Sequence, residues 1–258
     1  MSWASRRQIK YFSGFMLVVA VIVFIFIYPF IFKDSTCTDG KKNGDERGID
    51  CGGSCSIVCR EDTVAPAIIW SRAFKVIGNN YNLVAYVENR NKTAASYEAT
   101  YEFRVYDVNN KFIGRKEGKT YIPPNQPFAV IETRFNAGQA ELKTVSFEFT
   151  SNIVWVKKSP VLTTLPIRIS NITMDNNVDT PTLRATVNND SVYDLPEFDV
   201  VTILYDEDHN AINASKTHKA GLGSNSNTPV VFTWPEALIG APVTQDILVQ
   251  INPFLVSF

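Results

Sequence analysis

The strongest constraint in this sequence is an apolar run near the N-terminus, Phe12 to Phe32, which contains no charged side chain. A helix rises about 1.5 Å per residue, so a helix of this length matches a hydrocarbon core of about 30 Å. A lone segment in lipid must be helical, because only a helix or a closed barrel satisfies every backbone hydrogen-bonding group. The sequence therefore predicts one transmembrane helix over residues 12–32.

The residues before this run predict its orientation. Arg6, Arg7 and Lys10 precede it, and basic residues beside a span are usually held on the cytoplasmic side. The run is also too long for a cleaved signal peptide, and no small-residue cleavage site follows it. We therefore expect a signal anchor in the cytoplasmic membrane, with residues 1–11 as a cytoplasmic tail and the bulk of the chain outside.

Composition limits the function classes. The chain has 258 residues, 45% of them hydrophobic, and a formal net charge of −1. Beyond the anchor, this is enough apolar material for two ordinary cores. A nucleic-acid-binding protein would carry a basic face, which this charge balance argues against. We therefore expect partners other than DNA or RNA.

All the cysteines fall in one short stretch that is rich in glycine and acidic residues. Such a stretch cannot build an apolar core and needs covalent or ionic staples. Two disulfides suit the oxidising side of a membrane, and the sequence leaves all three pairings open. We expect a cysteine-rich neck over residues 33–62, stapled through Cys37, Cys51, Cys55 and Cys59.

The same stretch could hold a metal ion. Its hard oxygen ligands are of the kind that calcium prefers, and its glycines permit tight turns, although the spacing is not that of an EF-hand. The alternative is that the acidic residues only solvate a disulfide-bonded loop. Zinc on four thiolates is disfavoured by the cysteine spacing and by an oxidising compartment. The candidate calcium ligands are Asp39, Asn43, Asp45, Glu46 and Asp50.

The spacing of this stretch is similar to a known pattern. It resembles the Cys-x-Asp-Gly-x-x-Asn-Gly-x-Glu-x-Gly-x-Asp-Cys-Gly-Gly-x-Cys element of surface-exposed bacterial proteins. The stretch from Cys37 to Cys59 is 23 residues long. The resemblance implies that this part of the chain is exposed at a cell surface.

From Pro66 onward, apolar and polar residues alternate, with turn residues every eight to twelve positions. The segments 82–89 and 100–106 show the alternation most clearly. Many short strands separated by regular turns are typical of antiparallel β-sandwiches. No sustained helical period occurs outside the anchor. The sequence therefore predicts an all-β fold after the neck.

The sequence of this β region contains an internal repeat. The pattern Leu83-x-Ala85-x-Val87-x-Asn89 recurs as Leu183-x-Ala185-x-Val187-x-Asn189, and three later blocks match in the same order. A repeat of this kind indicates two copies of one domain. We place the boundary near Ser159–Pro160, which gives tandem sandwiches over residues 66–159 and 160–258. We expect Val105 and Leu204 to be equivalent buried residues, and each copy to unfold by itself.

Each copy also carries a strand that ends in Tyr-Asp, namely Phe103-Arg-Val-Tyr106-Asp107 and Thr202-Ile-Leu-Tyr205-Asp206. These segments resemble the Phe-x-Leu-Tyr-Asp domains of bacterial envelope proteins, although the second lacks the Phe. The resemblance implies an immunoglobulin-like or fibronectin-like sandwich and no activity. From the residues themselves we expect each Asp to cap the turn that follows it. We expect Tyr106 and Tyr205 to be packing residues.

The sequence contains no nucleophile elbow or phosphate-binding loop. We expect His209 and His218 to be exposed turn residues rather than catalytic groups. The chain is therefore expected to be a non-catalytic structural or interaction protein, such as an envelope-complex component or an adhesive display module. Its expected partners are other envelope or surface proteins, with residues 221–227 as an adaptable contact loop. The alternative is an accessory or sensing subunit that recognises a peptide or a glycan.

Overall fold

The computed structural model of the protein describes residues 3–31, 37–158, 165–175 and 179–256, with helix side chains described from residue 10 to residue 28. It has one helix at the N-terminus and is otherwise built of strands, which confirms the predicted all-β sandwich class. By its internal contacts the chain forms two compact units, Met1–Cys55 and Ser56–Phe258. The expected sandwich boundary at Ser159–Pro160 lies outside the described residues.

Helix α1 runs from Trp3 to Ile31 and therefore begins nine residues before the apolar run. The preceding segment contains no helix breaker, and Ala, Arg, Gln and Lys are good helix formers, so the basic tail is helical as well. From Lys10 to Tyr28 the helix is long and apolar enough to cross a membrane. Its large apolar side chains from Tyr11 to Tyr28 are exposed, which is the surface that lipid would cover.

The last part of the expected neck belongs to the second unit. Ile57 forms an antiparallel bridge with Val156, and the Val58 amide donates to the Trp155 carbonyl at 2.9 Å. A short 3₁₀ turn, η1, follows at Arg60–Asp62. Backbone pairing therefore fastens this segment to the first sandwich, so the neck ends earlier than residue 62.

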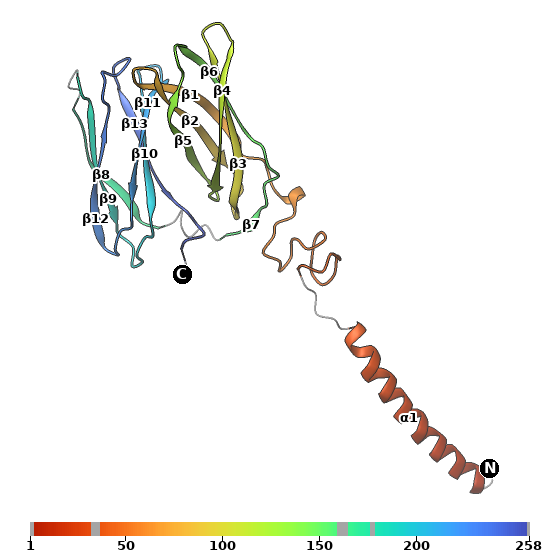
Figure 1. Ribbon diagram of the computed structural model, residues 1–258. Coiled ribbons are helices and arrows are strands. Elements are labelled where there is room, and N and C mark those ends of the chain that lie inside the picture. The colour runs from red at the N-terminus through yellow and green to blue at the C-terminus, as the bar shows by residue number, and fades with distance from the viewer. Residues whose placement is uncertain (1–2, 32–36, 159–164, 176–178, 257–258) are drawn as a thin grey trace. The chain divides into compact units, whose positions relative to one another are not determined.

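The unit from Ser56 to Phe258 contains two sandwiches of like design (Figure 1). The first is built from β1 (Ala67–Ile77), β2 (Asn80–Asn89), β3 (Ala94–Asp107), β4 (Phe112–Ile122), β5 (Gln126–Asn136), β6 (Leu142–Phe149) and the short β7 (Val156–Lys157). The second is built from β8 (Ile167–Asp175), β9 (Thr182–Asn189), β10 (Phe198–Tyr205), β11 (Ala211–Lys219), β12 (Ser226–Thr233) and β13 (Thr244–Ile251).

The two sandwiches have the same strand order, which confirms the internal repeat. In the first, the sheets are ordered β1-β2-β5 and β4-β3-β6. In the second, they are ordered β8-β9-β12 and β11-β10-β13, so each strand has a counterpart seven places on. All the pairings are antiparallel. The repeat in the sequence is thus a repeat of topology.

Each sandwich encloses its own core, built from the inward positions of the repeat. Leu83, Ala85 and Val87 lie in the first core, and their counterparts Leu183, Ala185 and Val187 lie in the second. Val105 and Leu204 also occupy equivalent core positions and are almost fully buried, as expected. Alternation on a strand places these residues on one face, so the repeat pattern marks the inner faces correctly.

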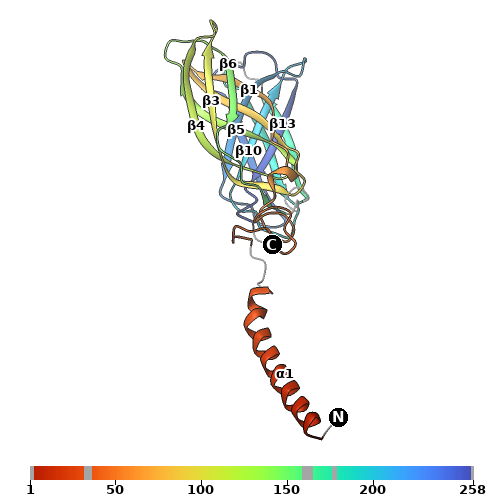
Figure 2. The same cartoon turned by 90° about the vertical axis from the view of Figure 1, so that its right-hand side faces the viewer.

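The two sandwiches pack against each other, because a third apolar cluster joins them. It brings together Phe74, Val84 and Ala129 of the sheet β1-β2-β5 with Val201, Ile203, Ala211 and Ala214 of the sheet β11-β10-β13. The four sheets therefore form a stack of layers in the second unit, with this cluster between the middle two (Figures 1 and 2). The expectation that each copy unfolds by itself conflicts with this shared buried surface.

Candidate functional site

The Tyr-Asp strand ends form the same turn in both copies. The Asp107 carboxylate accepts hydrogen bonds from the amides of Asn109 (2.8 Å) and Lys111 (2.9 Å). The Asp206 carboxylate accepts the equivalent bonds from Asp208 (3.0 Å) and Asn210 (2.8 Å). Each Asp therefore caps its hairpin turn, as predicted.

The turn position after these caps has a left-handed backbone in both copies. Asn110 has φ of 61° and His209 has φ of 60°. Residues other than glycine seldom take this conformation, and Asn, Asp and His tolerate it better than most. His209 is therefore an exposed turn residue, as expected.

His218 lies on strand β11, so the expectation that it sits in a turn was wrong. It is exposed, and its Nδ1 lies 3.0 Å from the Asp199 carboxylate on the neighbouring strand β10. Residues 218 and 199 are direct cross-strand partners. The pair is therefore a surface contact of the kind that stabilises sheets.

The repeated tyrosines serve the packing, although in different surroundings. Tyr106 makes an edge contact with Phe112, with ring centroids 5.8 Å apart. Tyr205 packs against the cluster between the sandwiches, and its hydroxyl donates to Asp246 at 3.0 Å. Burial, followed by the hydrogen bond to Asp246, raises the pKa of Tyr205 above its usual value. The copies have thus diverged at this position, since only Tyr205 is part of the joint.

The last residue of the repeated pattern, Asn89 in the first copy and Asn189 in the second, fixes a loop in its own sandwich. The Asn89 side-chain amide donates to the carbonyls of Ala94 (2.8 Å) and Pro123 (2.7 Å). The Asn189 amide donates to Tyr193 (2.8 Å) and Gly223 (2.9 Å). Both side chains are buried, and such groups are costly unless they are fully hydrogen-bonded. The Asn is therefore repeated for structural reasons.

The glycine- and serine-rich loop at residues 221–227 is held in place, contrary to the expected adaptable loop. Leu222 is buried and pairs with Leu195 through two backbone hydrogen bonds of 2.8 and 3.1 Å. The Ser224 amide donates to Asp194 at 2.7 Å, and the Asn225 amide donates to the Ser191 carbonyl at 3.0 Å. Backbone hydrogen bonds therefore fix a segment that its composition alone suggested was free.

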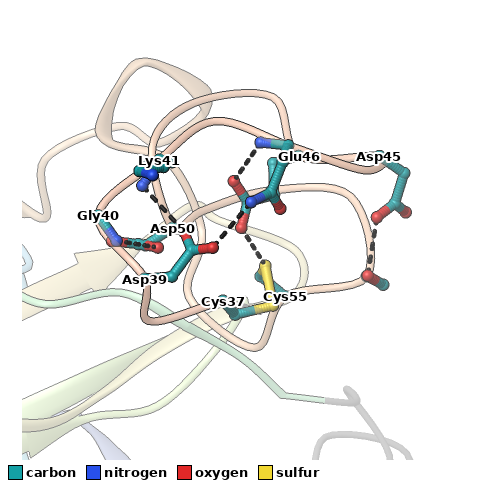
Figure 3. The surroundings of a disulfide bond; sticks show 10 residues. Cys37, Asp39, Gly40, Lys41, Asp45, Glu46, Asp50 and Cys55 are labelled. Carbon is teal, nitrogen blue, oxygen red and sulfur yellow. Dashed lines mark hydrogen bonds between the residues drawn. A yellow bond between two sulfur atoms is a disulfide. The ribbon is translucent and has the colours of Figure 1, made fainter. Parts of the chain in front are cut away.

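The cysteine loop of the first unit is stapled as predicted. Cys37 and Cys55 form a disulfide with an S–S distance of 2.08 Å (Figure 3). Cys51 and Cys59 are also disulfide-bonded, and the described part of the chain contains no free cysteine. Gly53 has φ of +51°, and a side chain there would meet the Asp45 carbonyl at 2.1 Å. The loop therefore depends on its disulfide bonds and on this glycine.

Most of the acidic side chains of this loop bind the loop itself (Figure 3). The Asp50 carboxylate accepts the Gly40 amide through both oxygens, at 3.1 and 3.0 Å. Asp39 accepts the Lys41 amide and the side chain of Asn43, at 3.0 and 2.8 Å. Asp45 accepts the Ser54 hydroxyl at 2.8 Å. These carboxylates hold turns that have no apolar core to order them.

Glu46 is the one buried carboxylate of this loop. It accepts the Asn43 amide at 3.2 Å and lies 3.4 Å from the Cys55 sulfur. Among the described residues, the only trio of potential metal-binding side chains within 4.8 Å is Cys37, Glu46 and Cys55, and two of these form a disulfide. No three of the candidate calcium-binding carboxylates thus come together in this arrangement, and calcium binding stays a prediction.

The joint between the sandwiches was not predicted from the sequence. Val84, Val201 and Ile203 are fully buried there, and Trp70 stacks on Tyr86 with ring centroids 5.6 Å apart. All of these are outward residues of their own sandwich, which alternation would otherwise direct to solvent. The joint therefore replaces solvent on one outer face of each sandwich.

Polar groups at the joint are paired across it. Arg72 of β1 donates to the Ala211 carbonyl of β11 at 2.7 Å. The Gln250 side chain of β13 accepts from the Ala129 amide at 2.8 Å and donates to the Ala129 carbonyl at 3.1 Å. A side-chain amide that engages both backbone groups of one residue fixes the register of the two sheets.

A comparison of the two copies explains why these particular faces meet. The outward residues Val84 and Tyr86 of β2 correspond to Arg184 and Thr186 of β9. Conversely, Val201 and Ile203 of β10 correspond to Glu102 and Arg104 of β3. Each copy thus has one apolar outer face, and the two copies use opposite faces. This difference is visible in the sequence at the positions between the repeated residues.

The outer face of the sheet β4-β3-β6 is covered by ion pairs instead. Arg104 binds both Glu102 and Glu148, the latter at 2.9 Å, and Arg115 binds Glu117 at 3.2 Å. Both apolar outer faces are used in the joint, and this charged face is of the kind that solvent covers.

The joint also creates a groove that neither sandwich has alone. It has a volume of about 670 Å³ and lies where three edge strands, β1, β6 and β11, approach the segment Trp234–Ile239. Its wall includes the cationic side chains Arg72, Lys75 and Lys143. Ligand sites in proteins commonly have volumes of about 300–1,000 Å³. The groove is therefore of the size of a ligand site and is a candidate binding site in the second unit.

No protein-family model and no curated protein sequence matches this chain. Among solved structures, a transglutaminase from red sea bream aligns with 70% of this chain and 31% of its own chain, at 10% identity and a TM-score of 0.24. A chaperone–tip adhesin complex of CFA/I fimbriae aligns with 72% of this chain and all of its own, at 12% identity and a TM-score of 0.20. The chain thus spans under a third of the transglutaminase, and these likenesses are too distant to carry an argument.

Proposed function

We propose that this protein is a membrane-anchored, non-catalytic interaction module that presents a rigid pair of β-sandwiches outside the cytoplasmic membrane. The joint between the sandwiches is the observation that carries the proposal, since Val84, Val201 and Ile203 are fully buried in it. Rigid packing of this kind fixes the spacing of surfaces on both sandwiches. A fixed surface lowers the ordering cost of binding a partner.

The anchor and the cysteines support the location. Helix α1 exposes apolar side chains over a length that fits a bilayer, and Arg6, Arg7 and Lys10 precede its apolar part. Basic residues at this end favour a cytoplasmic N-terminus. The disulfide between Cys37 and Cys55 fits an oxidising compartment beyond the membrane. The resemblance of the neck and of the Tyr-Asp strands to bacterial surface and envelope proteins supports the same placement.

The surfaces favour binding over catalysis. The two histidines are exposed, and the repeated Asp and Asn residues are occupied by their own turns and loops. The proposed partners are other envelope or surface proteins, held by the composite surface of the paired sandwiches. Hydrolytic or transfer activity in the purified protein would contradict this proposal.

The groove favours a second candidate, an accessory subunit that recognises a ligand and does not only hold a complex together. Its volume of about 670 Å³ would accept a short peptide or a compact small molecule. Both candidates share the anchor and the rigid pair. They differ in whether the partner is bound through the groove or through an outer face.

A cross-linking experiment in native envelopes tests the main proposal. The full-length chain is compared with the variant Val201→Glu/Ile203→Arg, which installs the two residues that the first copy has at these positions. These charges should separate the sandwiches, because moving an ion pair like Glu102–Arg104 from water into an apolar joint has a desolvation cost of several kcal/mol, which the attraction within the pair seldom offsets in full. We expect the cross-linked partner band to be lost while the chain stays in the membrane.

Two outcomes would count against the proposal. An unchanged partner band in the variant would assign binding to a single sandwich or to the neck. The orientation is checked by adding protease to intact spheroplasts, which should digest the chain beyond residue 33. Full protection until lysis would reverse the proposed topology.

A further inference from the structure

Positively charged side chains from two strands, β1 and β6, line the groove at the joint. Arg72 and Lys75 come from β1, and Lys143 comes from the start of β6. Lys75 and Lys143 are exposed, whereas Arg72 is half-buried and its guanidinium is fixed by the bond to the Ala211 carbonyl. Glu236 is the one acidic residue of the lining, and its carboxylate accepts the Gly78 amide at 3.2 Å. The groove therefore has a cationic surplus.

The groove also offers backbone hydrogen-bonding groups. β1 pairs only with β2, so the backbone along its other edge, from Ser71 to Val76, borders the groove without a partner strand. An edge strand with free amides and carbonyls is a template for an added strand. The neighbouring strand β6 contacts β1 through a side chain of β1, since the Ser71 hydroxyl donates a hydrogen bond to the Val145 carbonyl of β6 at 2.8 Å.

Trp234, which lines the groove, has an indole N–H donor without a hydrogen-bond acceptor among the described residues. Trp234 is 95% buried, yet no acceptor reaches its indole Nε1 among the described residues. It is the only buried side-chain nitrogen in that state in the described chain. Buried indole N–H groups usually find an acceptor, and Trp234 lines the groove while belonging to the core of the second sandwich.

We propose that the groove binds an acidic segment of a partner protein in extended conformation. Its main chain would pair with the free edge of β1, and its carboxylates would face Arg72, Lys75 and Lys143. The charge of the lining selects an acidic occupant, and the edge strand selects an extended one. This inference rests on the proposed interaction function and names the surface and the class of partner.

Binding of a defined probe tests the inference. The probe is an acidic peptide with fluorescein on its N-terminal amine, fluorescein-Glu-Glu-Val-Glu-Glu-amide, which presents carboxylates on both faces of an extended chain. Its binding to the full-length protein in detergent is followed by fluorescence anisotropy. The basic peptide with Lys in place of Glu is the matched ligand control, and succinate tests whether free carboxylates suffice. We expect saturable binding of the acidic peptide, little binding of the basic one, and weak competition by succinate.

Charge reversal locates the site. Lys75→Glu/Lys143→Glu should weaken binding by about tenfold, since exposed ion pairs contribute up to about 1 kcal/mol each. The control Lys92→Glu/Lys111→Glu changes the same net charge at exposed lysines outside the groove lining and should alter binding less than about twofold. Raising the salt concentration should weaken the wild-type complex.

Several results would overturn the inference. Equal losses in both double variants would show that only net charge attracts the peptide. Equal binding of the acidic and basic peptides would show that the groove does not select an acidic ligand. Displacement by succinate at peptide concentrations would show that it does not select an extended one. If Lys75→Glu/Lys143→Glu leaves the cross-linked partner of native envelopes in place, the groove assignment fails while the interaction function stands.

Discussion

Replacing Ile203 by alanine tests whether the two sandwiches act as one folded body. Ile203 faces away from the core of its own sandwich and is 0% exposed only because the first sandwich covers it. If the sandwiches did not pack together, this side chain would lie at the surface. The substitution therefore distinguishes a coupled pair from two independent domains.

The expected cost follows from burial. Ile→Ala removes three carbon atoms, which at about 0.8 kcal/mol per buried methylene is about 2.4 kcal/mol. The cavity that remains brings the usual range for such changes to about 2–5 kcal/mol. Surface substitutions outside special features usually stay within about 0.5 kcal/mol. The two arrangements thus predict free energies of unfolding that differ by more than ordinary experimental error.

Calorimetry together with amide hydrogen exchange provides the measurement. We expect the wild-type protein to unfold in one transition, with β3 and β9 exchanging through openings of similar free energy. Ile203→Ala should lower that shared stability or separate it into two transitions. Leu204→Ala, which cuts the core of the second sandwich, should also weaken protection in the first.

Arg184→Ala is the matched control, because Arg184 is exposed at the position equivalent to the buried Val84. It should leave the unfolding transition almost unchanged. The reasoning is refuted if Ile203→Ala costs less than about 1 kcal/mol, as for a surface site. It is equally refuted if Leu204→Ala unfolds the second sandwich alone.

Four further predictions concern single interactions. Asn189→Ala should cost about 1–3 kcal/mol in chemical denaturation, since buried carbonyls lose their donor; a neutral result would deny the Asn its structural role. Thr202→Val should stabilise the protein by about 1 kcal/mol, because the buried hydroxyl has no partner among the described residues, and a loss of stability would reveal one. Burial and Asp246 raise the pKa of Tyr205 above its usual value of 10.0. The contribution of the neutral phenol to the free energy of unfolding is therefore complete below pH 10.0 and is lost as the pH rises above that value. Tyr205→Phe should therefore reduce the alkaline loss of stability in pH-jump unfolding, and an unchanged profile would exclude this origin. Reduction of the disulfides should speed tryptic cleavage at the exposed Lys41, Lys42 and Arg47, whereas equal rates would show that hydrogen bonds alone order the loop.

The sequence by itself determines the elements whose causes are local. An uncharged run from Phe12 to Phe32 can only be helical in lipid, and alternation with period two identifies strands and their inner faces. The Tyr-Asp ends predict the capped turns at Asp107 and Asp206, because a carboxylate reaches the amides two and four residues on. Repetition of these local signals also predicts two sandwiches of one topology.

Only the tertiary structure decides what the outer faces do. Val84 and Ile203 are apolar at positions that alternation assigns to solvent, and their burial depends on a partner sheet more than one hundred residues away. The pairing of Cys37 with Cys55 and the pinning of residues 221–227 likewise depend on contacts between distant residues. The groove arises from the same cause, since its wall combines β1, β6 and β11. Local pattern specifies which side of a strand is apolar, whereas the surface that covers it is chosen by complementarity across the whole fold.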